Sequence, residues 1–290
     1  MPSCDVKELS TKLEQRLAEV DLHCNPFLVK WYNDLRMQVA PANPQLIESA
    51  PEDSVAFLIL AGPSNFESVV SYWNQKGWQK GMKMNFVDDA VTEMVTSRVE
   101  ATMETIPFFR DNSSEKHPWR LQNLDEPPYL HSQTVGTVTG VTQHLEPKDV
   151  GDDEWVRELE DEIKAQRSET DFLSSKAFGL SVHPQMGGWF VFRFVLFFPS
   201  VRLSGEEGSE GASLRLPPPL SFLSIEEKKR LLEEYNLRPN ESYWRDLHGP
   251  EGEPLESCRA YSAEAYLYFH TRQPGVRKRF LELKRRQMAA

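Results

Sequence analysis

The sequence predicts a soluble α+β protein with few strands, and two kinds of segment indicate this class. Two continuous apolar runs, VAFLILAG at 55–62 and GWFVFRFVLFF at 188–198, are typical of strands that are covered on both faces. The opening stretch 5–20 instead repeats apolar residues at helical spacing, at Val6, Leu9, Leu13 and Leu17. The sequence has no internal repeat. Helices and a small sheet should therefore pack together in a core rather than in a repeat array.

Length and charge narrow the class of protein. The chain has 290 residues, enough for one large domain or two modest ones. Its net charge of −11 argues against a nucleic-acid or acidic-membrane surface, and the basic run at 277–287 is typical of a solvated helix face. No signal peptide or apolar run of bilayer length is present. The cysteines, at positions 4, 24 and 258, fit neither a disulfide framework nor a zinc site, which favours the cytosol.

The first half of the chain predicts one strand between helices. After the apolar run at 55–62, Ser64 and Glu67 form a capping-box pattern that predicts a helix to about Lys76. A further helix is expected at 88–104. The polar, proline-rich segments 36–54 and 105–128 are expected to be loops.

The second half mixes strands and helices. Thr and Val dominate 132–145, which favours a strand, and the charged stretch at 153–166 predicts a helix. Segments 204–213 and 217–219 are typical of an exposed linker. Helices are then expected at 224–236, where Ser224 and Glu227 form a second capping-box pattern, at 262–271 and at 275–287.

Common catalytic motifs are absent from the sequence, which has no phosphate loop, no GxGxxG, no HExxH and no GxSxG. The histidines show no metal-binding spacing, and His183 before a proline is expected to be structural. Arg193 is the one charge within the apolar run 188–198. A guanidinium is costly there unless an anion answers it, so either an acid of the chain or a ligand should pair with Arg193.

A family resemblance rests on five segments in order along the chain. They are NPFLVKWYNDL (25–35), VAFLILAGPSNF (55–66), HPQMGGWFVFR (183–193), SYWRD (242–246) and YSAEAYLYF (261–269). Together they resemble the CblC family, the vitamin B12 processing proteins named for methylmalonic aciduria and homocystinuria type C. The resemblance implies a nitroreductase-like antiparallel sheet with flanking helices and a smaller cap region. It divides the chain into a cobalamin-binding core at 1–203, with an acidic helical insertion at about 147–172, and a helical cap at 204–290 that contributes to the thiol site.

The resemblance also implies a chemistry. Such proteins bind cobalamin with its base detached from cobalt and remove the upper axial ligand. Alkyl groups pass to glutathione, and cyanide leaves by reduction with a reduced flavin, FAD or FMN. The implied partners are a flavin or NADPH reductase as electron source and a CblD-type adaptor that receives cobalamin, with a ligand-dependent homodimer also open. Cytoplasmic location is implied as well.

Site residues follow from the same resemblance. Arg193, Arg245 and Arg277 fall at the glutathione positions, with Arg279 as a neighbour of Arg277. Arginine forks match carboxylates, and a cationic environment favours a thiolate. The cobalamin-binding positions, none of them a cobalt ligand, are Leu130, His131, Ser132, Gln133, His144, Leu145, Glu146, Ser181 and Phe192.

Several alternatives stay open. Gly187 and Gly188 serve either an unusual backbone turn or the close approach of the backbone to a flat cofactor ring, whereas Trp189 is expected in the core. The family's HxxG element has Thr137 in place of its histidine, and the acidic helix is either a lid or a solvated excursion. The competing functions are a non-catalytic cobalamin chaperone and a flavin oxidoreductase of nitroreductase type.

Overall fold

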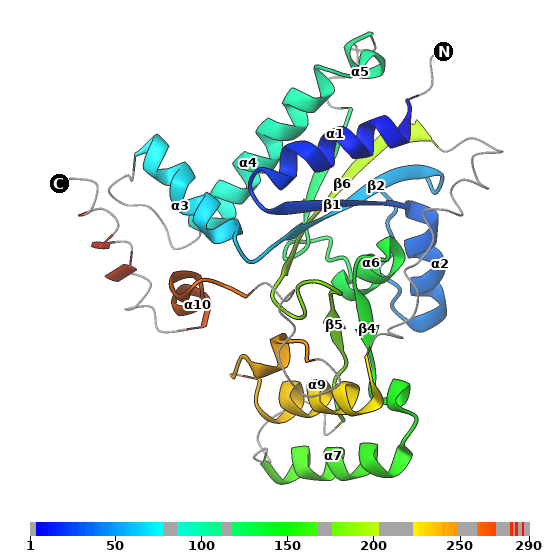
Figure 1. Ribbon diagram of the computed structural model, residues 1–290. Helices are drawn as coiled ribbons and strands as arrows, with labels where there is room; N and C mark the ends of the chain where they lie inside the picture. Colours follow the sequence, from blue (N-terminus) through cyan, green and yellow to red (C-terminus); the bar gives the residue numbers. More distant parts are fainter. Residues whose placement is uncertain are drawn as a thin grey trace.

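A four-stranded antiparallel sheet forms the centre of the computed structural model, in the order β1-β2-β6-β3 (Figure 1). The described residues are 4–77, 86–111, 118–166, 176–202, 223–239, 241–248, 260–270, 279–280, 282–283 and 286. The strands are β1 (Leu22–Leu28), β2 (Ser54–Ala61), β6 (Val191–Arg202) and β3 (Arg120–Asn123). The two apolar runs are the central strands β2 and β6, which confirms both predicted strands and the α+β class.

One face of the sheet carries the larger apolar core. It packs against α1 (Val6–Ala18), α3 (Asn65–Lys76), α4 (Phe86–Met103) and α10 (Ala263–His270). Leu9, Leu13 and Leu17 of α1 are fully buried there, as their helical spacing predicts. The other face packs against α2 (Val29–Val39) and α6 (Ser132–Thr139) around a separate core cluster. The sheet is therefore covered on both faces, which explains why β2 is buried along its whole length.

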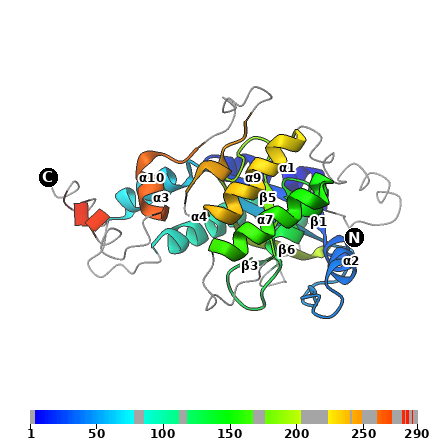
Figure 2. The ribbon, with the colours of Figure 1, turned by 90° about the horizontal axis from the view of Figure 1, so that it is seen from below.

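A smaller lobe lies below the sheet in Figure 1. It contains the antiparallel pair β4 (Gln143–Leu145) and β5 (Leu180–Val182), the 3-10 helix η1 (Pro147–Val150), α7 (Asp153–Gln166), α9 (Ile225–Leu237) and the 3-10 helix η3 (Tyr243–Arg245). A third apolar cluster fills it, with residues from both sides of position 203. The acidic helix α7 lies beside α9 (Figure 2), and its buried Leu159 and Ile163 join this cluster. Its charged face is exposed, so the helix is an outer layer of the small lobe.

Three local expectations are corrected. Residues 132–139 form helix α6 rather than a strand, because the His131 ring caps it and Gly140 ends it in the left-handed region. The supposed loop 105–128 contains α5 (Pro107–Asp111) and edge strand β3, whose pairing is supplied by β6. Ser64 makes no side-chain cap; its N–H instead donates to the Asp21 carboxylate.

The second capping box forms only in part. Ser224 caps α9 by accepting the N–H of Glu227, as expected. The Glu227 carboxylate does not turn back to the cap, because it binds Arg230 and the N–H of His248. The expected helix at 275–287 lies largely outside the described residues.

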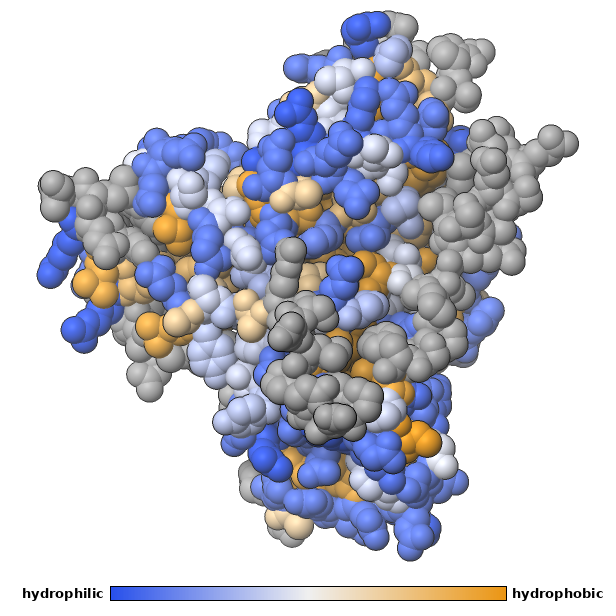
Figure 3. Space-filling model, viewed as in Figure 1, coloured by the Kyte–Doolittle hydropathy of each residue, from blue (hydrophilic) through white to orange (hydrophobic). Residues whose placement is uncertain are grey.

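The surface in Figure 3 is largely hydrophilic, with apolar residues in small separate groups. None of the described helices combines the length and the apolar character that crossing a bilayer requires.

Candidate active site

Arg193 lies at a β-bulge in the central strand β6. Phe194 is opposite Ile59 and Phe192 is opposite Leu60, so Arg193 is an extra residue between two successive pairs. The bulge turns Phe192 toward the α6 face of the sheet and Phe194 toward the α4 face. Arg193 thus enters the apolar run without displacing a core side chain.

The Arg193 guanidinium pairs with an acid of the chain. Its Nη1 donates to Oδ1 of Asp88, in the first turn of α4, at 2.6 Å. Its Nε is buried and has no hydrogen-bond partner among the described residues. The sequence left open an internal acid or a ligand. The internal acid is present, while the buried Nε has no partner within the described part of the chain.

Arg245 lies beside the glycine pair that precedes β6. The Gly188 N–H donates to the Arg245 carbonyl at 2.9 Å, and Nη1 of Arg245 donates back to the Gly188 carbonyl. The guanidinium stacks over the rings of Trp244 and Trp189, with 4.2 and 5.6 Å from Cζ to the ring centroids. Burial lowers the pKa of Arg245, but an arginine remains protonated in such surroundings.

The two glycines have distinct structural roles. Gly187 has φ of +55° in the tight turn where its N–H and carbonyl both bond to His183. A Cβ at Gly188 would lie 2.6 Å from the indole of Trp244, so the missing side chain makes room for the segment that carries Arg245. Trp189 is in the core, as expected, and its Nε1 donates to Asp246 at 2.7 Å. A role for the glycines toward a cofactor stays a prediction.

Tyr261 lies within the electrostatic influence of both arginines. Burial raises the pKa of its phenol, and the positive charges of Arg245 and Arg193 oppose this rise. Its ring packs on Trp189 with centroids 5.2 Å apart. The guanidinium of Arg245 lies over the same indole, and the charge of Arg193 also acts on the phenol. A shared thiol site for the two arginines stays a prediction.

The 3-10 helix η3 that carries Arg245 is fixed to α9 by another arginine. Arg230 donates to the carbonyls of Tyr243 and Asp246 at either end of η3, and to the carboxylates of Glu227 and Glu234 on α9. These charge-assisted bonds hold η3 against the small lobe. The position of Arg245 thus depends on both the glycine pair and α9.

The predicted cobalamin-binding residues lie at the start of α6, on and beside the β4–β5 pair and, in the case of Phe192, on β6. Leu130 is buried in the second core cluster, and Ser132 and Gln133 are half-buried at the beginning of α6. Nδ1 of His131 accepts the N–H of Thr134, which places the proton of the neutral ring on Nε2. Burial, with smaller contributions from Arg36 and His144, lowers the pKa of His131.

His144 and Ser181 face each other across the β4–β5 pair. Nδ1 of His144 and Oγ of Ser181 are both buried, and neither has a hydrogen-bond partner among the described residues. Burial lowers the pKa of His144, although Glu146 opposes this. Leu145, the residue after His144, is fully buried. Phe192 packs closely over Gly136 of α6. The structure therefore gathers most of these predicted residues around α6, β4 and β5.

Two residues of the site were not singled out from the sequence. Asp88 was assigned only to a helix, and no local pattern shows that it meets an arginine 105 positions away. Tyr261 belongs to the tyrosine-rich segment that carries the family resemblance, but no role followed from it. Arg277 lies outside the described residues, and Arg279 is exposed.

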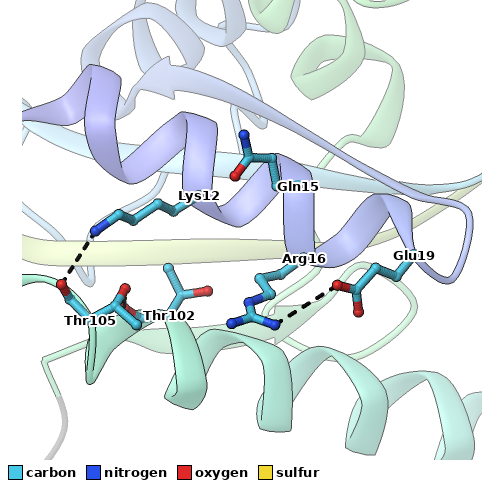
Figure 4. Close-up of a pocket in the computed structure, with 6 residues that line it drawn as sticks. All are labelled: Lys12, Gln15, Arg16, Glu19, Thr102 and Thr105. Carbon is cyan, nitrogen blue, oxygen red and sulfur yellow. Dashed lines mark hydrogen bonds and ion pairs between the residues drawn. The ribbon is translucent and has the colours of Figure 1, made fainter.

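A separate pocket of about 390 Å³ opens between α1 and α4 (Figure 4). Its polar groups bind one another: Lys12 donates to the Thr105 carbonyl, and Arg16 pairs with Glu19. Thr102, on its wall, is 14 residues from Asp88 along α4, or about 21 Å of helix. This pocket is therefore distinct from the arginine site. No group of three metal-ligating side chains occurs within the described residues.

Fold and site together define a nitroreductase-like α+β protein that holds two arginines at one end of its sheet. The sequence profile of the methylmalonic aciduria and homocystinuria type C family, MMACHC, matches residues 21–281. The chain belongs to this family.

The relatives cover nearly the whole chain. A Gallus gallus protein named cyanocobalamin reductase / alkylcobalamin dealkylase is 27% identical over 280 residues, which are 96% of this chain and 98% of the relative. The Homo sapiens protein of the same name is 24% identical over 88% of this chain and 77% of the relative. The crystal structure of a B12-trafficking protein CblC from C. elegans matches with a TM-score of 0.63 and 22% identity, over 97% of this chain and 95% of that one. This last likeness bears on the fold alone, and it agrees with the predicted fold class.

Proposed function

We propose that this protein is a cobalamin-processing enzyme that binds cobalamin with its base detached and removes the upper axial ligand. Family membership and the names of the relatives support this reading. The observation that carries it furthest is the nearly buried guanidinium of Arg193, whose Nε has no partner among the described residues, because such a cation suits an anionic co-substrate.

Glutathione is the proposed alkyl acceptor. Its thiolate attacks the carbon bound to cobalt, the carbon–sulfur bond forms, and both electrons of the cobalt–carbon bond stay on cobalt. Arg193 and Arg245, with Arg277 as the third proposed residue, bind its carboxylates and favour the thiolate. The unused Nε donor of Arg193 supports this fit, because a bound carboxylate would satisfy it.

Cobalamin is the proposed substrate on the α6 side of β6. Nδ1 of His144 and Oγ of Ser181, which are buried and have no partner among the described residues, suit the amide groups around a corrin ring. The proposed contacts also include Leu130, His131, Ser132, Gln133, Leu145, Glu146 and Phe192. No protein ligand to cobalt is proposed, and Nδ1 of His131 already accepts a hydrogen bond from Thr134.

Reductive decyanation extends the proposal to cyanocobalamin. A reduced flavin, FAD or FMN, supplies the electrons when bound, and a flavin or NADPH reductase regenerates it. We further propose a cytoplasmic location, delivery of cobalamin to a CblD-type adaptor, and association into a homodimer when ligand is bound. These proposals follow from the family and have no residue of their own in the described structure.

The test adds methylcobalamin and glutathione anaerobically and follows the visible spectrum. We expect a shift to the base-off form on binding, then cob(I)alamin together with S-methylglutathione. Arg193→Ala should raise KM for glutathione about tenfold or more, since a charge-assisted bond contributes about 1.5–3 kcal/mol. Arg202→Ala is the matched control, because Arg202 is an ion-paired arginine at the other end of β6.

The other outcomes of this test distinguish between the competing functions. Full dealkylation by Arg193→Ala at limiting glutathione would contradict the arginine assignment. A base-off shift without dealkylation or decyanation would identify a cobalamin chaperone. Flavin-dependent reduction with no cobalamin shift would identify an oxidoreductase of nitroreductase type.

A further inference from the structure

The arginine of the proposed thiol site already holds a carboxylate. Arg193 binds Asp88 through one hydrogen bond of 2.6 Å, from Nη1 to Oδ1. The side chain of Arg193 is 11% exposed, whereas that of Asp88 is 52% exposed. The pair is thus a nearly buried cation capped from the solvent side by a carboxylate.

The two partners differ in how firmly they are held. Arg193 is the bulged residue of a central strand, and its carbonyl also accepts the N–H of Leu124 at 3.1 Å. Asp88 is half in solvent and lies in the first turn of α4, where the helix dipole favours a negative charge whether or not an arginine is near. The Asp88 carboxylate can therefore leave Arg193 for solvent at a small cost, while Arg193 stays in place.

We propose that Asp88 is a specificity-determining residue: an internal carboxylate that competes with the carboxylate of an anionic thiol for Arg193. This inference rests on the proposed function. In the free protein Asp88 neutralises a guanidinium that would otherwise be buried and uncompensated. On binding, the substrate carboxylate takes the place of the Asp88 carboxylate on Arg193. The protein therefore binds anionic thiols less tightly than it would if Arg193 had no internal partner. A neutral thiol does not compete with Asp88.

The experiment compares Asp88→Asn with Asp89→Asn, which removes the same charge from the neighbouring exposed position of α4. Calorimetry with S-methylglutathione, which undergoes no thiol chemistry, measures binding directly. We expect Kd to fall about three- to tenfold in Asp88→Asn, because the ligand no longer has to displace a partly buried ion pair. In Asp89→Asn, Kd should stay within about twofold of wild type.

Two further readouts separate competition from a structural role. Free Asp88→Asn should melt below wild type, because Arg193 loses its partner, yet S-methylglutathione should raise its melting temperature by more than that of wild type. KM for glutathione should fall in the same ratio as Kd, while dealkylation by 2-mercaptoethanol, which has no carboxylate, should not change.

The inference is wrong if folded Asp88→Asn binds S-methylglutathione no better than wild type does. Asp88→Ser provides a second variant, because serine suits the first turn of a helix and also removes the charge. If neither variant folds, Asp88 is an indispensable structural partner and the inference is wrong. If wild type itself neither binds glutathione nor dealkylates methylcobalamin, the proposed function fails. If wild type does both and the variants do not tighten binding, only the role of Asp88 fails.

Discussion

Replacing Gly188 by alanine should disturb the contact that places Arg245. An added Cβ would lie 2.6 Å from Cζ3 of Trp244 and 3.1 Å from both Cα and Cγ of Arg245. The indole can move, but the backbone of Arg245 is bonded to that of Gly188 at 2.9 Å. Overpacking of this kind costs about 1–3 kcal/mol. The melting temperature should therefore fall by about 2–5 °C for a chain of this size.

The control for this change is Gly151→Ala. Gly151 has φ of +71° and no atom within 4 Å of an added Cβ, so alanine there is strained by about 1 kcal/mol without a clash. Thermal unfolding followed by circular dichroism measures the stability of both variants. Calorimetry with S-methylglutathione then measures the site. Kd should rise about tenfold for Gly188→Ala, the loss of one charge-assisted bond, and should not change for Gly151→Ala.

The reasoning is refuted by a Gly188→Ala protein that melts within 1 °C of wild type, roughly the resolution of such a measurement, or by one that binds S-methylglutathione equally well. The first result would mean that the close approach to Trp244 is easily relieved. The second would mean that Arg245 does not hold the thiol.

Two other measurements test the core of the fold. Burial, and to a smaller extent His23, lowers the pKa of His183 to about 4, so its neutral form stabilises the fold above pH about 6.5 and about 3 kcal/mol is lost as the pH falls toward 4. Urea unfolding between pH 7 and 4.5 should show this loss of stability in wild type, and the stability of His183→Asn should fall less over the same range. An equal pH dependence of the two proteins would contradict the assignment of this loss to His183. Asn236→Ala removes hydrogen bonds to the N–H and carbonyl of Phe178 and to the Leu232 carbonyl, so urea unfolding should report a loss of about 2–4 kcal/mol, and a loss below about 0.5 would show that these bonds are replaced by water.

The sequence predicted those parts of the fold whose signals are local. The helix at 6–18 follows from apolar spacing, the helix at 153–166 from a charged stretch and the helix at 225–237 from a capping-box pattern, and β2 and β6 follow from continuous apolar runs. Edge strand β3 has no such signal, because RLQN is polar and pairs only where β6 supplies the partner. Thr and Val at 132–139 favoured a strand, and tertiary packing of α6 on the sheet overrode that propensity.

The residues of the candidate site could also be predicted only in part. Family motifs gave Arg193 and Arg245, and the charges of both act on the phenol of Tyr261. The acid that answers Arg193 could not be predicted, because any of 44 acidic residues could have met it and the pairing is set by how α4 packs on the sheet. The β-bulge at Arg193 could not be predicted either, because the spacing of Phe192 and Phe194 would put both side chains on one face of a regular strand.

The bulge explains how one strand can contribute to both proposed binding sites. In a regular strand Phe192 and Arg193 would point to opposite faces, but Phe192 and Phe194 would share a face. The extra residue instead puts Phe192 toward α6, beside the proposed cobalamin contacts, and returns Phe194 to the core under α4. Arg193 is left at the break between these two registers, with its carbonyl bonded to Leu124 and its guanidinium on the Asp88 side. The proposed cation for the thiol and the proposed aromatic contact to the corrin are thus adjacent residues that face opposite sides of one strand.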